Sequence, residues 1–342
     1  MAANPAIVRT DGPTTWFRDT KYLIQDRIDE GLKDPIYDLF GEVTPPTRAN
    51  QISITGRDNI RTGRTKAEGG QVAPQSPVEE DQKTQYYITF EASMVISYES
   101  MVHDQYKFAE EDPAELVDNV FRGISRLLHA QLFNGYSSTT VTLLGTAGSY
   151  DISMPNGKSV FSSTHSGPGY SSKSNLYSDA PLSIPNITAA GQHGIKNFVH
   201  STGERMTNFQ ADLIIVPSQL EMVEAAVQHT RSEKVSGTAN NAINYYKGMM
   251  DVAELRYAPE SSADNSYSTT LQYHYIVANK ALLKKSIGYT FAERPRVFTK
   301  FMDPDNGDSK ITVLARVATV PKRWQFGVFV PATTAPTHPG QV

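Results

Sequence analysis

Cysteine is absent from this chain of 342 residues. Its absence excludes disulfide bonds, thiol nucleophiles and cysteine-ligated zinc sites. The chain also lacks a run of about 18 apolar residues, so we expect no membrane-spanning helix and no membrane partner. The first residues, MAANPAIVRTDG, lack the charged and apolar regions of a secretory signal, so we expect synthesis in the cytoplasm.

An excess of positive charge is missing as well. The chain has 32 Lys and Arg against 36 Asp and Glu, a formal charge of −4, and its pI is about 6.1. Proteins that bind a DNA duplex through its phosphates usually carry a basic patch and have a high pI. Because this chain has a low pI, we expect only weak, non-specific contact with DNA. The hydrophobic content of 39% and charged content of 20% are those of a globular protein with a real core.

Catalytic and metal-binding motifs are also missing. The sequence contains no HExxH, GxSxG, GxxxxGK[ST] or GxGxxG. His193 and His200 are spaced to share a helix face, but no carboxylate joins them. Residues 303–308 (DPDNGD) resemble the start of a calcium loop, but Leu314 stands where the closing glutamate should be, so we interpret them as a hairpin turn. We therefore expect no catalytic, metal or cofactor-binding residues and no enzymatic activity.

A long hydrophilic stretch lies between two segments with β-strand alternation. It covers residues 57–82, RDNIRTGRTKAEGGQVAPQSPVEEDQ, which hold too little apolar surface to offset the entropy lost on ordering. Polar and apolar residues alternate over 50–56, before this stretch. Residues 85–98 alternate after it and predict a strand of about 14 residues, roughly 45 Å long. The two segments predict a long hairpin.

Two arrangements of this hairpin are open. It can fold back on its own domain, or it can project and be completed by sister copies, since a two-stranded ribbon is not stable alone in water. We favour the second, because the two limbs carry opposite charge: five basic and one acidic side chain (+4) over 48–66, and one basic and four acidic (−3) over 67–83. Neutralisation of one limb by the other is the alternative. The expected inter-subunit contact residues are Arg57, Arg61, Arg64, Lys66, Glu68, Glu79, Glu80 and Asp81.

The clearest helix is predicted over about 112–134. Asp112-Pro113-Ala114-Glu115 has the pattern of an N-cap, a first-turn proline and a capping-box carboxylate, and Asn134-Gly135 ends the helix. Its apolar residues recur at helical spacing. The side chains expected to pack are Leu116, Val120, Phe121, Ile124, Leu127 and Leu128.

The remaining elements follow from the same rules. We expect helices over 16–32, from Asp34-Pro35 to Gly41, over 184–201, and from a capping box at Ser218 to about His229. We expect strands over 213–216, 273–278, 297–302, 310–320 and 324–330, with irregular chain over 230–270. The order of elements predicts an α+β fold.

This order of parts resembles the major capsid proteins of tailed phages, of the Hong Kong 97 type. The segment HAQLFNGY (129–136) resembles the end of that family's spine helix. The segments PNGKSVFSSTHSG (155–167) and SNLYSDAPLS (174–183) are similar to a part of the phage Mu-like major head subunits. Residues 211–221, and the C-terminal region from 273–280 to 315–330, have the same character. The resemblance covers nearly the whole chain, through loose motifs that encode turns and strands.

The resemblance implies a domain organisation. It comprises an N-terminal arm (1–47), an extended E-loop hairpin (48–98) and a peripheral P-domain with the spine helix (99–150). An axial A-domain with its connections (151–290), a return to the P-domain strands (291–332) and a C-terminal tail (333–342) follow. Many family members begin with a scaffolding extension, whereas here the arm starts almost at Met1, which implies a separate scaffolding protein or none. Some members cross-link subunits through an E-loop lysine, for which Lys66 and Lys83 are the candidates by position.

The function implied is that of a major capsid protein. It would assemble as hexamers and pentamers into an icosahedral shell around packaged double-stranded DNA, be made in the bacterial cytoplasm and reside in the virion. The implied partners are portal, scaffolding and decoration proteins. The alternatives are an encapsulin-type nanocompartment shell, another virion structural protein, and a hydrolase whose motif is not evident.

Overall fold

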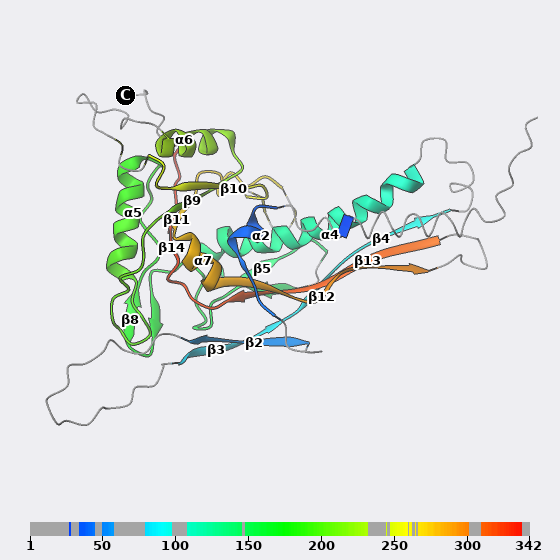
Figure 1. Cartoon of the computed structure of the whole chain (residues 1–342), viewed down its shortest axis with the longest axis horizontal. Coiled ribbons are helices and arrows are strands. Elements are labelled where there is room, and N and C mark those ends of the chain that lie inside the picture. Colours follow the sequence, from blue (N-terminus) through cyan, green and yellow to red (C-terminus); the bar gives the residue numbers. More distant parts are fainter. Residues whose placement is uncertain are drawn as a thin grey trace, which may run out of the picture. The chain divides into compact units, whose positions relative to one another are not determined.

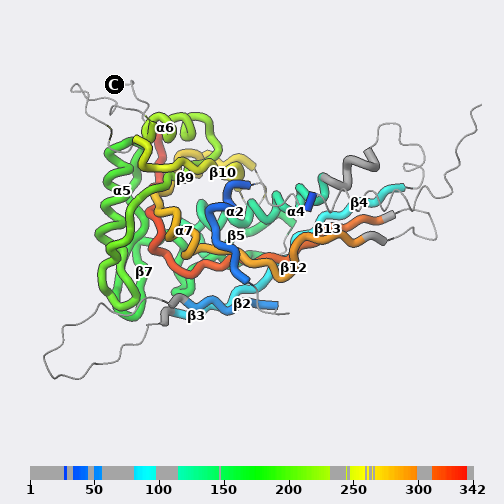
Figure 2. The backbone as a smooth tube through the Cα atoms, viewed as in Figure 1, coloured from blue at the N-terminus to red at the C-terminus, as the bar shows by residue number. Residues whose placement is uncertain are grey.

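The computed structural model describes most of the chain, and its elements are shown in Figures 1 and 2. The described residues are 27–28, 34–44, 50–57, 79–97, 108–145, 148–231, 244, 247–258, 260–261, 264, 266–300 and 309–336. The chain divides into two compact units. The first comprises 1–33, 87–124 and 291–317, and the second comprises 34–86, 125–290 and 318–342.

The first unit contains long antiparallel strands and the first part of a long helix. Strand β4 (Ile88–Ile96) pairs with β13 (Ser309–Pro321), from Ile96 opposite Ser309 to Ile88 opposite Val317. Burial along β4 alternates, as expected for a strand with one covered face. Of the sheet order β1-β12-β13-β4, strand β12 is Ile287–Lys300, and β1 (Gly41–Glu42), which belongs to the second unit, pairs with Gly288 and Tyr289 of that unit.

The long helix α4 (Phe108–Phe133) approaches β4 closely at a glycine. A Cβ atom on Gly123 would lie only 2.8 Å from Cδ1 of Phe90, so the ring occupies the space that a larger residue would need. Leu116, Val120 and Ile124 are buried along the helix. The apolar stripe predicted from sequence therefore faces covered surface.

The second unit contains a mixed four-stranded sheet of order β10-β9-β11-β14. Its strands are Asp251–Leu255 (β10), Leu213–Pro217 (β9), Tyr275–Ala278 (β11) and Gly327–Val330 (β14). Strand β9 runs parallel to β10 and antiparallel to β11, which is itself antiparallel to β14. The three strands other than β10 are buried along their whole length, as is typical of a sheet covered on both faces.

Three helices of this unit are described together, and two of them begin at a capping side chain. Helix α5 (Ile184–Asn197) is capped by Ser183, whose hydroxyl accepts from the Asn186 N–H, and it packs on β14 and β11. Helix α7 (Lys280–Ser286) is capped in the same way by Asn279. Helix α6 (Leu220–Arg231) packs on β9 and β10.

The second unit also contains short helices and two-stranded ribbons. Helix α2 is Ile36–Leu39, and a 3-10 turn at Asn134–Tyr136 follows α4. The ribbons are β2 (Gln51–Arg57) with β3 (Glu79–Tyr86), β5 (Thr140–Thr142) with β6 (Ser149–Asp151), and β7 (His165–Gly167) with β8 (Tyr170–Lys173). None of the helices among the described residues combines the length and apolar character needed to cross a membrane.

Several expectations from sequence are confirmed at the level of the element. Helix α5, helix α6 and strands β9 and β11 lie where the pattern placed them. Asp34 accepts from the Ile36 N–H at 3.0 Å, so the expected short helix starts at its predicted signal. The whole predicted turn over 303–308 and most of the helix expected over 16–32 lie outside the described residues.

Other expectations are wrong in their bounds. Helix α4 begins at Phe108, so the capping sequence from Asp112 lies inside the helix. The single strand expected over 85–98 is two strands, β3 and β4, separated at Tyr87 and paired in different sheets. Strand β10 lies in the region expected to be irregular. The hydroxyl of Ser218, the predicted N-cap of helix α6, donates to Glu254 at 2.7 Å.

Candidate functional site at the base of the hairpin

The base of the β2–β3 hairpin has one buried face and one exposed face. Ile52 and Ile54 of β2, with Lys83 and Gln85 of β3, are between 2% and 9% exposed. The residues between them point the other way and are exposed. Because side chains alternate along a strand, the hairpin base is covered on one side only.

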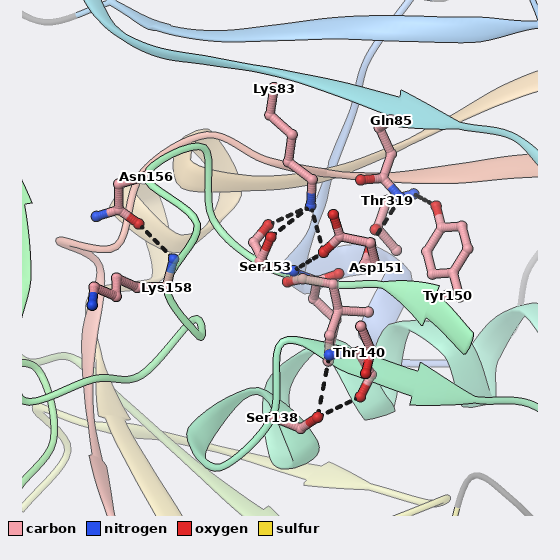
Figure 3. Close-up of polar contacts among 12 residues, drawn as sticks. Lys83, Gln85, Ser138, Thr140, Tyr150, Asp151, Ser153, Asn156, Lys158 and Thr319 are labelled. Atoms are coloured by element: carbon pink, nitrogen blue, oxygen red, sulfur yellow. Dashed lines mark hydrogen bonds and ion pairs between the residues drawn. The ribbon is translucent and has the colours of Figure 1, made fainter.

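Lys83 is the centre of the buried contact. Its ammonium donates to the backbone oxygen of Ser153 at 2.7 Å and to the Ser153 hydroxyl at 3.2 Å, and it lies 3.1 Å from the Asp151 carboxylate. Figure 3 shows the Lys83 side chain pointing from its strand onto Ser153 and Asp151. A buried ammonium needs such partners, because an unpaired charge away from water is costly.

Gln85 lies beside Lys83 and extends the same contact. Its side-chain amide donates to the backbone oxygen of Asp151 at 2.9 Å. Tyr150, next to it, accepts from the Thr319 N–H at 3.1 Å (Figure 3). The hairpin base is thus fixed to its own chain by polar groups as well as by Ile52 and Ile54.

This contact corrects part of the sequence prediction. The ribbon was expected to be completed by sister copies and not by its own body, whereas its base packs on residues 151–153 of the same chain. The prediction failed because lysine and glutamine are mostly exposed in proteins, so Lys83 and Gln85 were expected to face solvent. The tip of the hairpin, residues 58–78, lies outside the described residues.

The charges of this site perturb each other. Burial lowers the pKa of Lys83, and the Asp151 carboxylate opposes that effect only in part. Burial acts to raise the pKa of Asp151, but hydrogen bonds from Ser153 and the charge of Lys83 outweigh it, so the pKa of Asp151 lies below its ordinary value of 3.8. At neutral pH the Asp151 carboxylate is therefore ionised.

We expect the contribution of Asp151 to be lost in acid. A carboxyl whose pKa is lowered by folding stabilises the folded state fully above its unfolded pKa, and this stabilisation disappears as the pH falls through the folded pKa. The free energy of unfolding of the wild type should therefore exceed that of Asp151→Asn at pH 5 to 7, by an amount that shrinks below about pH 4. Urea titrations of both chains across this range measure the difference, and a difference independent of pH would contradict the assignment.

A second polar cluster fixes residues 34–40 to α4. Nε2 of His129 lies 3.2 Å from the Asp34 carboxylate, and both side chains are buried. Burial lowers the pKa of His129 despite its carboxylate partner, so His129 is neutral at pH 7 and donates to Asp34. The hydroxyl of Ser125 donates to the hydroxyl of Tyr37 at 3.1 Å. The N-terminal segment thus enters the fold through contacts with the helix.

The structure describes only some of the predicted contact residues. Asp81 lies exposed on β3. Only the backbone of Arg57, Glu79 and Glu80 is described, at the ends of β2 and β3, where Arg57 is opposite Glu79. The four remaining residues, Arg61, Arg64, Lys66 and Glu68, lie outside the described residues. The structure therefore places the base of the predicted contact surface and leaves its charged tip as a prediction.

The exposed face of the hairpin base carries few charges. Ser53 accepts from the Gln82 side chain across the two strands, and Tyr86 is 65% exposed. The other exposed residues of this face are Gln51, Thr55 and Thr84. An exposed tyrosine among uncharged polar residues has the composition of an interface rather than of ordinary surface.

The predicted packing residues of α4 lie along its covered side. Leu116, Val120, Ile124, Leu127 and Leu128 are 8% exposed or less, and Phe121 is half-buried. The exposed residues of the same helix include Glu115 and Arg122.

The two cross-link candidates differ in what is described. Lys66 lies outside the described residues. The ammonium of Lys83 is held by Asp151 and Ser153 of its own chain, which argues against its use as a free nucleophile toward another subunit.

Metal-ligating side chains do not cluster within the described residues. In that part of the chain, no three His, Asp or Glu side chains gather to hold a metal ion. The hollow lined by Arg126, His129, Tyr257 and Glu260 contains polar groups that pair with each other or with Asp34, for example Arg126 with Glu260 at 2.9 Å. His193, whose spacing from His200 suggested a shared helix face, packs edge-on against Tyr177.

The fold, with its long helix, hairpin and mixed sheet, is that of phage capsid chains. The mature capsid of bacteriophage PhiM1 aligns with a TM-score of 0.52 at 15% identity, over 88% of this chain and 87% of that one. A structure of Gordonia phage Cozz aligns with a TM-score of 0.53 at 11% identity over the same shares. The capsid of cyanophage P-SCSP1u aligns with a TM-score of 0.52 at 9% identity over 88% of each chain.

These similarities are in structure alone. No protein-family model and no curated protein matches the sequence. Because the alignments extend over nearly the full length of both chains, the shared fold is that of the whole subunit and not of one motif.

Proposed function

We propose that this protein is the major capsid protein of a tailed bacteriophage and forms the shell that encloses packaged double-stranded DNA. The observation that carries the proposal is the full-length structural match to chains of phage particles. The lack of a catalytic constellation in the sequence accords with a role in assembly. The protein would then reside in the virion and have a structural, non-enzymatic role.

The Hong Kong 97-type layout is part of the proposal. In it, β2–β3 is the base of the E-loop, α4 is the spine helix of the P-domain, and the sheet of β10, β9, β11 and β14 belongs to the A-domain. The similarity of residues 155–183 to Mu-like head subunits belongs here too. Copies would meet as hexamers and pentamers, through the loop residues from Arg57 to Asp81.

Multiplicity explains how such contacts hold a shell. Each subunit makes the same few contacts, and contacts within a closed assembly reinforce one another through effective concentration. The chain's negative charge suits a wall that encloses DNA without binding it tightly. Portal, scaffolding and decoration proteins are the further partners proposed. The matches to phage particles do not favour the nanocompartment alternative.

Electron microscopy of the purified recombinant chain tests the proposal. We expect closed particles, or hexamers and pentamers that close when a scaffolding protein is supplied. Analytical ultracentrifugation over a wide concentration range provides the second measurement. Single molecules at every concentration, with and without scaffolding protein, would contradict a role in a shell.

A further inference from the structure

Three successive backbone carbonyls, those of Asp151, Ile152 and Ser153, accept side-chain hydrogen bonds in alternation from two different elements. We call these three residues the strap. Gln85 of β3 donates to the first carbonyl at 2.9 Å, Gln131 of α4 to the second at 2.9 Å, and Lys83 of β3 to the third at 2.7 Å.

The donors have little freedom to find other partners. Gln131 is fully buried, and Gln85 is 2% exposed. Within the described residues, the side-chain oxygens of both glutamines are buried without a hydrogen-bond partner, so each amide bonds through its nitrogen, and Gln85 also forms a side-chain hydrogen bond with Tyr150. Displacement of the strap would therefore take from the buried Gln131 amide its partner, the carbonyl of Ile152, or from the Lys83 ammonium its partner, the carbonyl of Ser153.

The strap is itself held in the core. Ile152 is fully buried, and its N–H donates to the backbone oxygen of Thr139 at 2.9 Å. Asp151 fixes the turn of the strap by accepting from the Ser153 N–H at 2.8 Å. Ile152 and Ser153 of the strap are thus buried, whereas Asp151 is exposed. The strap bonds to the hairpin through the carbonyls of Asp151 and Ser153 and to the helix through that of Ile152.

We propose that the strap couples the position of the hairpin base to the last turns of α4. A change that moves the helix end at Gln131 shifts the strap and loosens the contacts of Lys83 and Gln85, and release of the hairpin loosens the helix end in return. Such coupling is reciprocal, because it is a free energy shared by two sites. Its use in assembly rests on the proposed function, since a neighbour that engages the hairpin would then be sensed at the helix.

Hydrogen exchange on unassembled, full-length subunits tests the coupling. In Gln131→Leu, we expect the amides of 51–55 and 82–86 to exchange about 5- to 10-fold faster relative to those of β9. Gln325→Leu is the matched control, because Gln325 is also buried and donates to one backbone carbonyl, that of Val199 at 3.1 Å. The control should leave the ratio of hairpin to β9 exchange unchanged.

The reciprocal variant keeps the test decisive if Gln131→Leu does not fold. In Lys83→Met, the amides of 129–133 should exchange faster relative to those of β9. An unchanged ratio in either folded variant, or an equal rise in Gln325→Leu, overturns the proposal. The readout does not depend on shell formation, so failure of the coupling and failure of the capsid assignment are distinguished.

Discussion

Subunits in which residues 60–78 are replaced by a short Asn-Gly turn are expected to remain folded and soluble but to form no stable shells. The replacement leaves the paired and buried part of the hairpin, with Ile52, Ile54, Lys83 and Gln85, in place. It removes Arg61, Arg64, Lys66 and Glu68, four of the eight residues proposed to contact neighbours. Because each subunit repeats the lost contact, we expect the yield of closed particles to fall by about 100-fold or more.

Circular dichroism would measure the fold of the shortened subunit, and electron microscopy with sedimentation would measure the particles. In a second variant, the same residues are replaced by a Gly-Ser sequence of equal length. This variant separates the effect of the hairpin's charge from the effect of its length. If charge segregation between the limbs guides assembly, this variant should also fail at physiological salt. Normal shells from the shortened chain would contradict the proposed role of the hairpin.

Periodicity predicted the elements whose burial pattern is local. The apolar run of β9, the apolar spacing of α5 and the apolar stripe of α4 each carry their signal within a few residues. The start of α4 was misplaced because Pro113 is favoured in a first turn, yet the helix runs through it from Phe108. A capping pattern thus indicates the presence of a helix more reliably than it indicates where that helix begins.

The break between β3 and β4 could not be predicted from alternation alone. In β4 the even-numbered residues, such as Phe90, face covered surface, whereas in β3 the odd-numbered Lys83 and Gln85 do. The phase changes at Tyr87, where the chain leaves one pairing for another. Polar and apolar residues alternate without interruption through Tyr87, so the sequence gives no sign that the buried face switches there.

The anchor of the hairpin was missed for a different reason. Lys83 and Gln85 are buried because backbone oxygens and a carboxylate of residues 151–153 satisfy them, and those partners lie far along the chain. Strand β10 is likewise short and half polar, and it becomes a strand through its pairing with β9. Signals of this kind belong to tertiary structure and not to local sequence.

Leu128→Ala is expected to destabilise the subunit strongly. Its side chain is fully buried, so truncation loses both the transfer free energy of the removed atoms and the packing around the space they leave. We expect the free energy of unfolding to fall by about 2–5 kcal/mol. A urea titration of unassembled subunits measures this change.

Arg122→Ala is the matched control for this prediction, because Arg122 lies on the same helix and is exposed. We expect it to change the free energy of unfolding by no more than about 0.5 kcal/mol. Equal effects of the two changes would mean that the stripe through Leu128 is not a packing surface. Leu128→Ala should strongly lower the free energy of unfolding of the subunit, whereas the hairpin replacement should leave its fold nearly unchanged. Together these results would show that the helix and the hairpin have different roles. The helix would then maintain the subunit, and the hairpin would join subunits to each other.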